Sequence, residues 1–247
     1  MSLFSLTSKG ESFWYNLLMK TVGIIGGLGP ETTAKFYLEV IFGCQKKNAV
    51  SRPPLLIWNV PLKYEIERDL LIKSVGEDRY IPYLTEAAQR LEKGGADFLV
   101  IPCNSLHIFI NQIRKSVQIP VLNIVEETAR FLKNKEIRKV GILATSSLLN
   151  HKLYETYLEK GGIKQVTPSP TDQNKVGELI NNLVLNRYTE KDKTDLLGII
   201  RKFRKRGLKY VILACTDLQL LVPQYPEIEI YDTMKIFADV TVNEILK

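Results

Sequence analysis

Residues 94–105 read Gly-Gly-Ala-Asp-Phe-Leu-Val-Ile-Pro-Cys-Asn-Ser, and the order of residue types in this stretch indicates the fold. An amphipathic helical pattern precedes it, and Gly94 and Gly95 are the residues that commonly end a helix with a left-handed cap. The apolar run Asp97–Ile101 has the length of a buried strand. Pro102-Cys103-Asn104-Ser105, the first cysteine loop, follows directly. The stretch therefore predicts a helix, a buried strand and a cysteine at the strand's carboxyl end.

The same order of residue types recurs 112 positions later without a gap. Leu196, Ile199, Ile200 and Phe203 form the apolar stripe of a second helix, and Gly207 stands where its cap is expected. A second apolar strand ends in Ala214-Cys215-Thr216-Asp217, the second cysteine loop. A gapless match that places a cysteine and a polar loop in both copies predicts two similar α/β domains related by a pseudo-twofold axis.

Strand and helix patterns alternate along the rest of the chain, which favours an α/β fold with parallel sheets. We predict one domain from residues 19–118 together with 229–247, carrying Cys103, and a second from 119–228, carrying Cys215. Residues 1–18 are interpreted as an N-terminal extension. The active site is expected in the cleft between the domains. The predicted strands are Thr21–Ile25, Leu55–Asn59, Asp97–Ile101, Val121–Ile124, Lys139–Leu143, Tyr210–Leu213 and Glu229–Tyr231.

Composition excludes several classes of function. The 247 residues are 45% apolar and 25% charged, as in ordinary globular proteins, and no apolar run approaches the roughly 20 residues of a membrane helix. The net charge of +7 is spread along the chain without a nucleic-acid motif, so we expect no nucleic-acid partner. Three cysteines and two histidines without metal-ligand spacing argue against disulfides and a metal site. Without a signal-peptide pattern, a cytoplasmic location is predicted.

The positions of Cys103 and Cys215 suit a pair of proton-transfer groups. Ligands of parallel sheets bind beyond the carboxyl ends of the strands, where both cysteines are predicted to lie. A following helix N-terminus lowers a thiol's pKa. Inverting an amino acid's α-carbon requires one group that removes a proton from one face and another that protonates the opposite face. Cys44, by contrast, lies in a helical pattern and is expected to serve only in packing.

The loop Gly23-Ile24-Ile25-Gly26-Gly27-Leu28-Gly29-Pro30-Glu31 joins the first predicted strand to a helix. Backbone N–H groups in such a loop can bind a substrate carboxylate, although glycines here can also serve a tight turn alone. Neither nucleotide-binding glycine pattern is present. We expect Gly27 in this loop and Asn59, at the end of the second strand, to contact the substrate.

At these residues the sequence resembles the aspartate/glutamate racemase family, especially its aspartate racemase-like branch. The resemblance implies two Rossmann-like domains, no cofactor, a two-base thiol mechanism and a homodimer. It also implies that Asn104, Ser105, Thr145 and Thr216 line the substrate site, with Asp217 beside them, and His107 matches a histidine of the family's first motif. The stretches that carry it are TVGIIGGLGPETT (21–33), GGADFLVIPCNSLH (94–107), IPVLNIVEET (119–128), VGILAT (140–145) and LACTD (213–217).

Departures from the family pattern leave the substrate open. The residue after Cys-Thr is usually Glu, whereas here it is the shorter Asp217. A lysine that some aspartate-specific members carry corresponds to Leu185, and their arginine after the second strand is not evident in residues 59–67. Lys63, Arg68 and Lys175 are the cations that could replace them. An amino-acid racemase is the leading hypothesis; an isomerase or decarboxylase of dicarboxylic acids, a non-catalytic amino-acid-binding module and a pyridoxal enzyme remain alternatives.

Overall fold

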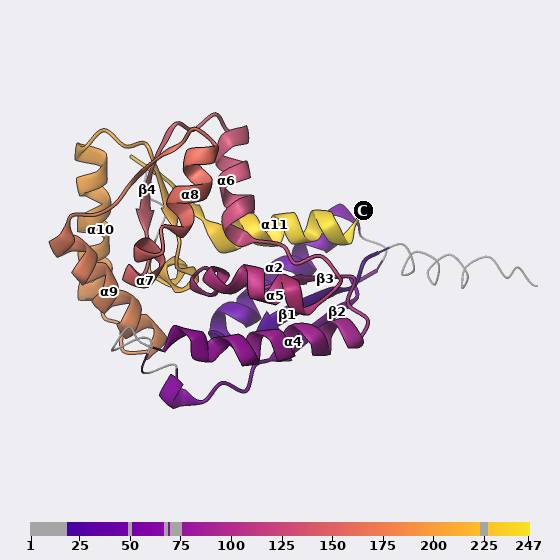
Figure 1. Ribbon diagram of the computed structural model, residues 1–247. Helices are drawn as coiled ribbons and strands as arrows, with labels where there is room; N and C mark the ends of the chain where they lie inside the picture. The colour runs from indigo at the N-terminus through magenta and orange to yellow at the C-terminus, as the bar shows by residue number, and fades with distance from the viewer. Residues whose placement is uncertain (1–18, 49–50, 67–68, 70–75, 223–226) are drawn as a thin grey trace, which may run out of the picture.

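The structure is a computed structural model that describes residues 19–48, 51–66, 69, 76–222 and 227–247 (Figure 1). The predicted extension, residues 1–18, lies outside the described residues. The strands are β1 (Val22–Gly26), β2 (Leu55–Asn59), β3 (Phe98–Val100), β4 (Lys139–Leu143), β5 (Lys164–Val166), β6 (Tyr210–Leu213) and β7 (Glu229–Asp232). The α-helices are α2 (Pro30–Lys47), α4 (Ile81–Lys93), α5 (Ile110–Ser116), α6 (Ile124–Asn134), α7 (Ser146–Asn150), α8 (Leu153–Lys160), α9 (Pro170–Val184), α10 (Glu190–Lys205) and α11 (Thr233–Ile245). Short 3-10 helices are η1 (Glu77–Tyr80), η2 (Ser105–Phe109) and η3 (Thr216–Leu220).

Two parallel sheets confirm the predicted α/β fold class. The strand order is β2-β1-β3 in the first sheet and β5-β4-β6-β7 in the second. In the first sheet, Val121 forms an isolated parallel bridge to Leu99 of β3. This bridge is at the place that β7 has beside β6 in the second sheet. The two sheets therefore have the same order of strands, and β3 and β6, which precede the cysteines, occupy equivalent places.

The C-terminal ends of the two helices that precede β3 and β6 have the same hydrogen-bond pattern as well as similar sequences. After α4, the N–H of Gly95 bonds to the Glu92 carbonyl and the N–H of Ala96 to the Leu91 carbonyl. After α10, Gly207 and Leu208 bond in the same way to Arg204 and Phe203. Gly95 and Gly207 have φ of 94° and 77°, so the left-handed caps predicted from the glycines are present in both copies.

Buried side chains form three clusters because successive strand residues point to opposite faces of a sheet. In β1, Ile24 packs into a middle cluster and Ile25 into a cluster with α4 and α5. In β6, Ile212 packs into the same middle cluster, whereas Leu213 faces α9 and α10 in a third one. The inner faces of both sheets thus share a single core.

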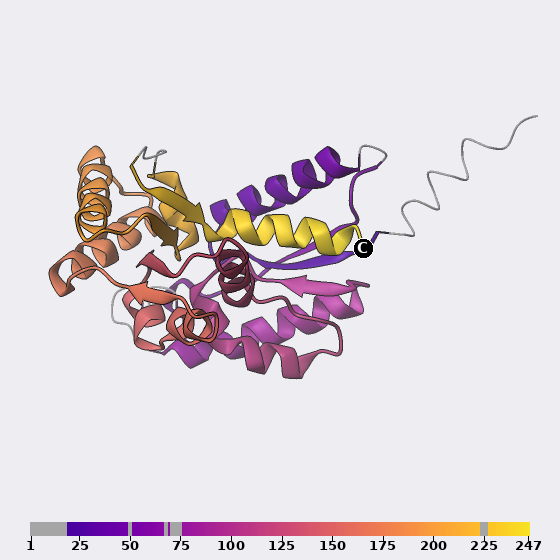
Figure 2. The ribbon, with the colours of Figure 1, turned by 90° about the horizontal axis from the view of Figure 1, so that it is seen from above.

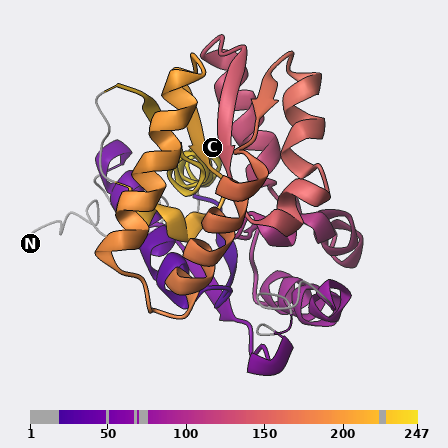
Figure 3. The same cartoon turned by 90° about the vertical axis from the view of Figure 1, so that its left-hand side faces the viewer.

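The helix α11 is the centre of this shared core. It packs against α2 on one side and α6 on the other. In Figures 1 and 2 it starts at the second sheet and runs alongside the strands of the first sheet, and it is seen nearly end-on in Figure 3. Its buried side chains cover most of the helix circumference and leave one exposed stripe at Lys235, Asp239 and Asn243. The buried residues are Thr233, Met234, Ile236, Phe237, Ala238, Thr241, Val242 and Ile245. A helix apolar on most sides is stable only when several elements cover it.

Local details differ from the sequence-based expectations at three places. The segment Val121–Ile124 is not a strand, because only Val121 makes a bridge and Ile124 begins α6. The strand β5 was not predicted, since Lys164 is exposed and the segment lacks an apolar alternation. The strand β7 pairs with β6 of the second sheet, although α11 after it packs against α2. The division at residues 118/119 and 228/229 stays a prediction.

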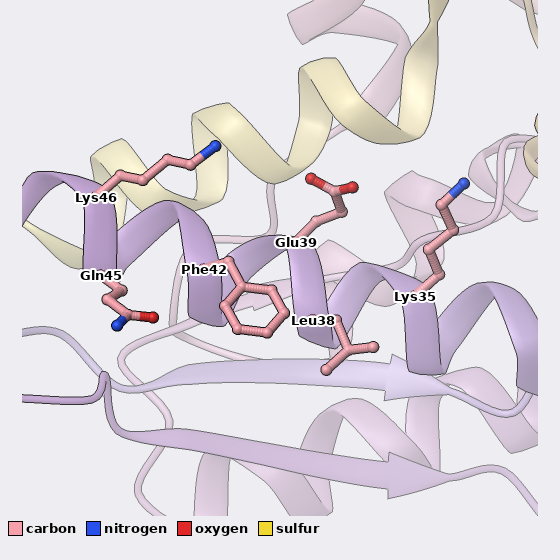
Figure 4. A pocket seen from close by; sticks show the side chains of 6 residues that line it. All are labelled: Lys35, Leu38, Glu39, Phe42, Gln45 and Lys46. Carbon is pink, nitrogen blue, oxygen red and sulfur yellow. The ribbon is translucent and has the colours of Figure 1, made fainter.

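No helix within the described ranges combines the length and apolar character needed to cross a membrane. A surface hollow runs along the outer side of α2, where Leu38 and Phe42 are exposed between charged and polar side chains (Figure 4). Its lining residues are Lys35, Leu38, Glu39, Phe42, Gln45 and Lys46, none of which belongs to the cysteine loops. The hollow is therefore not the site that the sequence predicts.

Candidate active site

The two cysteines lie at the carboxyl ends of the equivalent strands. Cys103 comes three residues after β3 ends at Val100 and is partly exposed, whereas Cys215 comes two residues after β6 ends at Leu213 and is 8% exposed. Charge on Cys103 raises the pKa of Cys215, so the two thiols lie near enough to interact electrostatically. Within the described residues neither thiol takes part in a disulfide, which fits a pair of proton-transfer groups.

The environment of Cys215 differs from the sequence-based expectation of a lowered thiol pKa. Burial raises the pKa of Cys215 well above its usual value, and the charge of Asp217 adds to the rise. Hydrogen bonds from the backbone N–H groups of Asp217 and Leu218 act in the opposite direction but do not outweigh burial. The following helix η3 has only five residues, so its dipole is small. The pKa prediction is thus wrong for Cys215, because desolvation dominates.

The carboxylate of Asp217 joins the second cysteine loop to the N-terminal half of the chain. One oxygen, Oδ2, lies 3.8 Å from the Cys215 sulfur, which donates to it. The other, Oδ1, accepts a 2.8 Å hydrogen bond from the hydroxyl of Thr32 in the first turn of α2. Thr32 stands within a stretch that carries the family resemblance, but the sequence did not single it out, since its partner is 185 positions away.

The glycine loop after β1 is hydrogen-bonded to the first turn of α2, the helix that follows it. The Gly27 N–H donates to the Thr33 hydroxyl at 3.0 Å, and that hydroxyl donates to the Gly29 carbonyl at 2.9 Å. A Cβ on Gly27 would lie 2.5 Å from Oδ1 of Asn59, so the Asn59 side chain packs directly against the loop. A Cβ on Gly29 would lie 3.9 Å from Asp217. The structure thus brings Gly27, Asn59 and Asp217 to one region.

Asn104 lies in a buried hydrogen-bond network rather than at a surface. It is 1% exposed; its Oδ1 accepts from the Tyr154 hydroxyl at 2.6 Å, and its Nδ2 donates to Thr233 at 3.0 Å. The Thr233 hydroxyl donates in turn to the Leu213 carbonyl at 2.8 Å. The network joins the first cysteine loop to the ends of α8 and β6. Tyr154 and Thr233 were not predicted, because no local pattern marks a partner from another part of the fold.

Two further predicted residues meet where the first cysteine loop faces β4. The hydroxyls of Ser105 and Thr145 are 3.2 Å apart. Thr145 also caps α7 by accepting from the Leu148 N–H at 3.3 Å. Thr216 is buried beside Cys215, and its carbonyl accepts a 2.7 Å bond from Gln219. The sequence-predicted residues therefore gather along the loops after β1, β3, β4 and β6.

His107 supports the first cysteine loop from within the protein. Its ring is fully buried and lies edge-on to Phe237, with 6.2 Å between ring centres. Burial lowers the pKa of His107 to about 4, so the ring is neutral near pH 7. A buried neutral ring without a path to solvent is suited to positioning the loop rather than to binding a charged ligand.

The cations considered for a side-chain carboxylate do not form an evident subsite. Lys63 and Lys175 are exposed, and Arg68 lies outside the described residues. Leu185, at the end of α9, is exposed as well. Within the described part of the chain, no group of three or more His, Cys, Asp or Glu side chains is placed to hold a metal ion.

Comparisons with known proteins identify the family and agree with the fold. The family model for Asp/Glu/Hydantoin racemase matches residues 25–241. The broad specificity amino-acid racemase RacX of Bacillus subtilis is 27% identical over 230 residues, which are 91% of this chain and 98% of RacX. A Yersinia pestis protein described as a candidate Asp/Glu racemase superimposes with a TM-score of 0.81 at 27% identity, over 93% of this chain and 100% of that one. PH1733, an aspartate racemase homologue from Pyrococcus horikoshii OT3, has a TM-score of 0.74 at 25% identity, over 92% and 99%.

Proposed function

Because this chain belongs to the Asp/Glu/Hydantoin racemase family, we propose that it interconverts L- and D-amino acids with Cys103 and Cys215 as its two bases. The observation that carries the proposal is the pair of thiols at equivalent strand ends, near enough for the charge of one to raise the pKa of the other. A binding module would need the loops but not two interacting thiols.

The proposed reaction moves two protons on opposite faces of the α-carbon. In one direction the Cys103 thiolate takes the α-proton, so an S–H bond forms as the C–H bond breaks. The electron pair left on the α-carbon is then protonated by the Cys215 thiol, which becomes a thiolate. The reverse direction exchanges the two roles. Each turnover inverts the substrate and leaves the proton count of the protein unchanged.

Stabilisation of the carbanion is the energetic problem of this reaction, since an α-proton is far less acidic than a thiol. We assign part of it to hydrogen-bond donors near the substrate carboxylate: the hydroxyls of Ser105, Thr145 and Thr216 and the loop at Gly27. Asn59 holds that loop from outside, and Asn104 holds the first cysteine loop through its buried bonds. No cofactor is required in this proposal.

The substrate is proposed to be an amino acid chosen with broad tolerance. The relative RacX is named for broad specificity, and the described residues form no evident pair of cations for a side-chain carboxylate. A buried carboxylate without a cation is costly, which disfavours strict selection of aspartate or glutamate. A panel that includes neutral, acidic and basic amino acids therefore belongs in the first test.

The deciding experiment is deuterium exchange in D₂O with single-enantiomer amino acids and the purified full chain. We expect deuterium at the α-carbon together with inversion for at least one amino acid. Cys103→Ala and Cys215→Ala should each lower racemisation by at least about 10³-fold. Each variant should still exchange the α-proton of one enantiomer without inversion, and the two variants should prefer opposite enantiomers.

Two outcomes would count against the proposal. If no amino acid, in either enantiomer, takes up deuterium at its α-carbon, dicarboxylic acids as substrates or a binding function become the better explanations. Near wild-type racemisation in either cysteine variant would refute the two-base assignment. The homodimer implied by the resemblance is a separate prediction. The molar mass from light scattering during size-exclusion chromatography tests it directly.

A further inference from the structure

The two oxygens of the Asp217 carboxylate contact residues from different halves of the chain. Oδ2 faces the thiol of Cys215 at 3.8 Å, and Oδ1 faces the hydroxyl of Thr32 at 2.8 Å. Thr32 is 3% exposed and is the third residue of α2, a helix of 18 residues. The hydroxyl is therefore held by a long helix of the first half, while Asp217 and Cys215 belong to a loop of the second half.

The place of Thr32 on α2 favours this contact twice. A hydroxyl hydrogen bond to a carboxylate is charge-assisted and stronger than one between neutral groups. The first turn of α2 also carries the positive end of the helix dipole, and a Cβ on its cap residue Gly29 would lie 3.9 Å from Oδ1. Both effects hold the carboxylate at one position and thus fix its other oxygen beside Cys215.

We propose that Thr32 is a positioning residue: its hydrogen bond keeps the Asp217 carboxylate against the Cys215 thiol, so that Cys215 holds the proton and Cys103 is the thiolate in the resting protein. The assignment of roles to the cysteines rests on the proposed racemase function. The contact itself does not, because it concerns only the protonation of a thiol beside a carboxylate.

The groups that face Cys215 support this distribution of protons. Among the described residues, Asp217 and Cys103 are charged or titratable groups that act on Cys215, and both raise its pKa, as burial does. The backbone N–H groups of Asp217 and Leu218 favour the thiolate but are outweighed. Cys103 is partly exposed to solvent, whereas Cys215 is buried. The two bases are chemically unequal although their loops are equivalent in the fold.

Inequality of the bases has a kinetic consequence. Free enantiomers have equal free energies, so kcat/KM must be equal in the two directions, for the wild type and for every variant. A change in proton distribution appears instead in kcat and KM taken separately for each enantiomer. Loss of the Thr32 contact should therefore alter the ratio of the two kcat values while the two kcat/KM values remain equal to one another.

Thiol alkylation tests the contact without turnover. The background is Cys44→Ala/Cys103→Ala, in which Cys215 is the remaining one of the three cysteines in the sequence. Iodoacetamide labelling of Cys215 is followed by mass spectrometry between pH 6.5 and about 10, a range that brackets the usual thiol pKa. We expect Thr32→Val to shift the profile to lower pH and to raise labelling at pH 8 by several-fold. Asp217→Asn should shift it further, and Thr32→Ser should restore it.

A matched Thr→Val change provides the control. The hydroxyl of Thr241 is buried and bonds to the Phe237 carbonyl within α11, far in sequence from both cysteine loops. An unchanged Cys215 profile in Thr32→Val, or an equal shift in Thr241→Val, would overturn the inference. If the profile shifts but no amino acid is racemised, the contact stands and the proposed function fails. If racemisation occurs but the labelling profile does not shift, the proposed function stands and the inference about Thr32 fails.

Discussion

The Nδ1 atom of His107 lies 2.8 Å from the carbonyl oxygen of Cys103. The other ring nitrogen, Nε2, accepts a 3.2 Å hydrogen bond from the N–H of Ile124 at the start of α6. An acceptor role for Nε2 leaves the ring proton on Nδ1, which then donates to the Cys103 carbonyl. The neutral ring thus fastens the backbone of a proposed catalytic residue to the next helix, and protonation would break the bond to Ile124.

This arrangement predicts a pH-dependent loss of stability. Burial lowers the pKa of His107 from 6.5 to about 4, so between these values the unfolded chain binds a proton that the folded protein does not. The free energy of unfolding therefore falls as the pH drops through this window, by about 3 kcal/mol in total from this group. Urea unfolding of His107→Gln at pH 7 and pH 4.5 should show a flatter dependence than the wild type.

The exposed His151 supplies the matched control for this experiment. Burial raises the pKa of Asp232 to about 6, and a raised carboxyl pKa changes stability in the opposite direction over part of the same range. Since Asp232 is present in both His107→Gln and His151→Gln, the difference between these variants isolates His107. Equal pH dependence in the two variants would contradict the prediction.

The buried bond between Tyr154 and Asn104 should show energetic coupling. Tyr154→Phe leaves Oδ1 of Asn104 without this donor, and we expect a loss of about 2 kcal/mol in the free energy of unfolding. Asn104→Ala should cost more, because the bond to Thr233 is lost too. Their double mutant should be less destabilised than the sum by about 1 kcal/mol. Tyr157→Phe, which removes a bond between a partly exposed hydroxyl and Glu126, is the control; additive losses would argue against the network.

Comparing alanine substitutions at Gly27 and Gly95 distinguishes the effect of backbone strain from that of a side-chain clash. Both have positive φ, but a Cβ on Gly27 would meet Oδ1 of Asn59 at 2.5 Å, whereas a Cβ on Gly95 meets nothing within 4 Å. Gly95→Ala should lower the free energy of unfolding by about 1 kcal/mol and leave racemisation unchanged. Gly27→Ala should also lower kcat/KM by at least about tenfold, since a small displacement of positioning groups is costly. Equal kinetics for the two variants would refute a role for the loop in the site.

Cys44 should matter for packing alone. It is fully buried in the middle cluster, and burial raises the pKa of its thiol to about 11. We expect Cys44→Ala to retain wild-type racemisation and to lose roughly 1 kcal/mol of stability, because the substitution leaves a small cavity. Iodoacetamide should not label Cys44 in the folded protein at pH 8. A large loss of activity, or fast labelling, would show that this thiol has a further role.

The sequence by itself determined the features that depend on neighbouring residues. The glycine caps after α4 and α10, the strands β3 and β6 and the cysteines after them follow from local backbone preference and apolar pattern. Their gapless repetition also predicted two sheets, which the equal strand order bears out. The short strand β5 escaped prediction, because three residues with one buried side chain carry too little pattern.

Only the tertiary structure decided how these local units act on one another. Packing of α11 between α2 and α6 creates the shared core, and it places Thr233 beside Asn104. The bond from Thr32 to Asp217 joins residues 185 positions apart, and burial by remote segments raises the pKa of Cys215 where a local view predicts a lower one. Conformational preference is a property of a few adjacent residues, whereas desolvation and hydrogen bonding depend on which distant atoms fill the surrounding space.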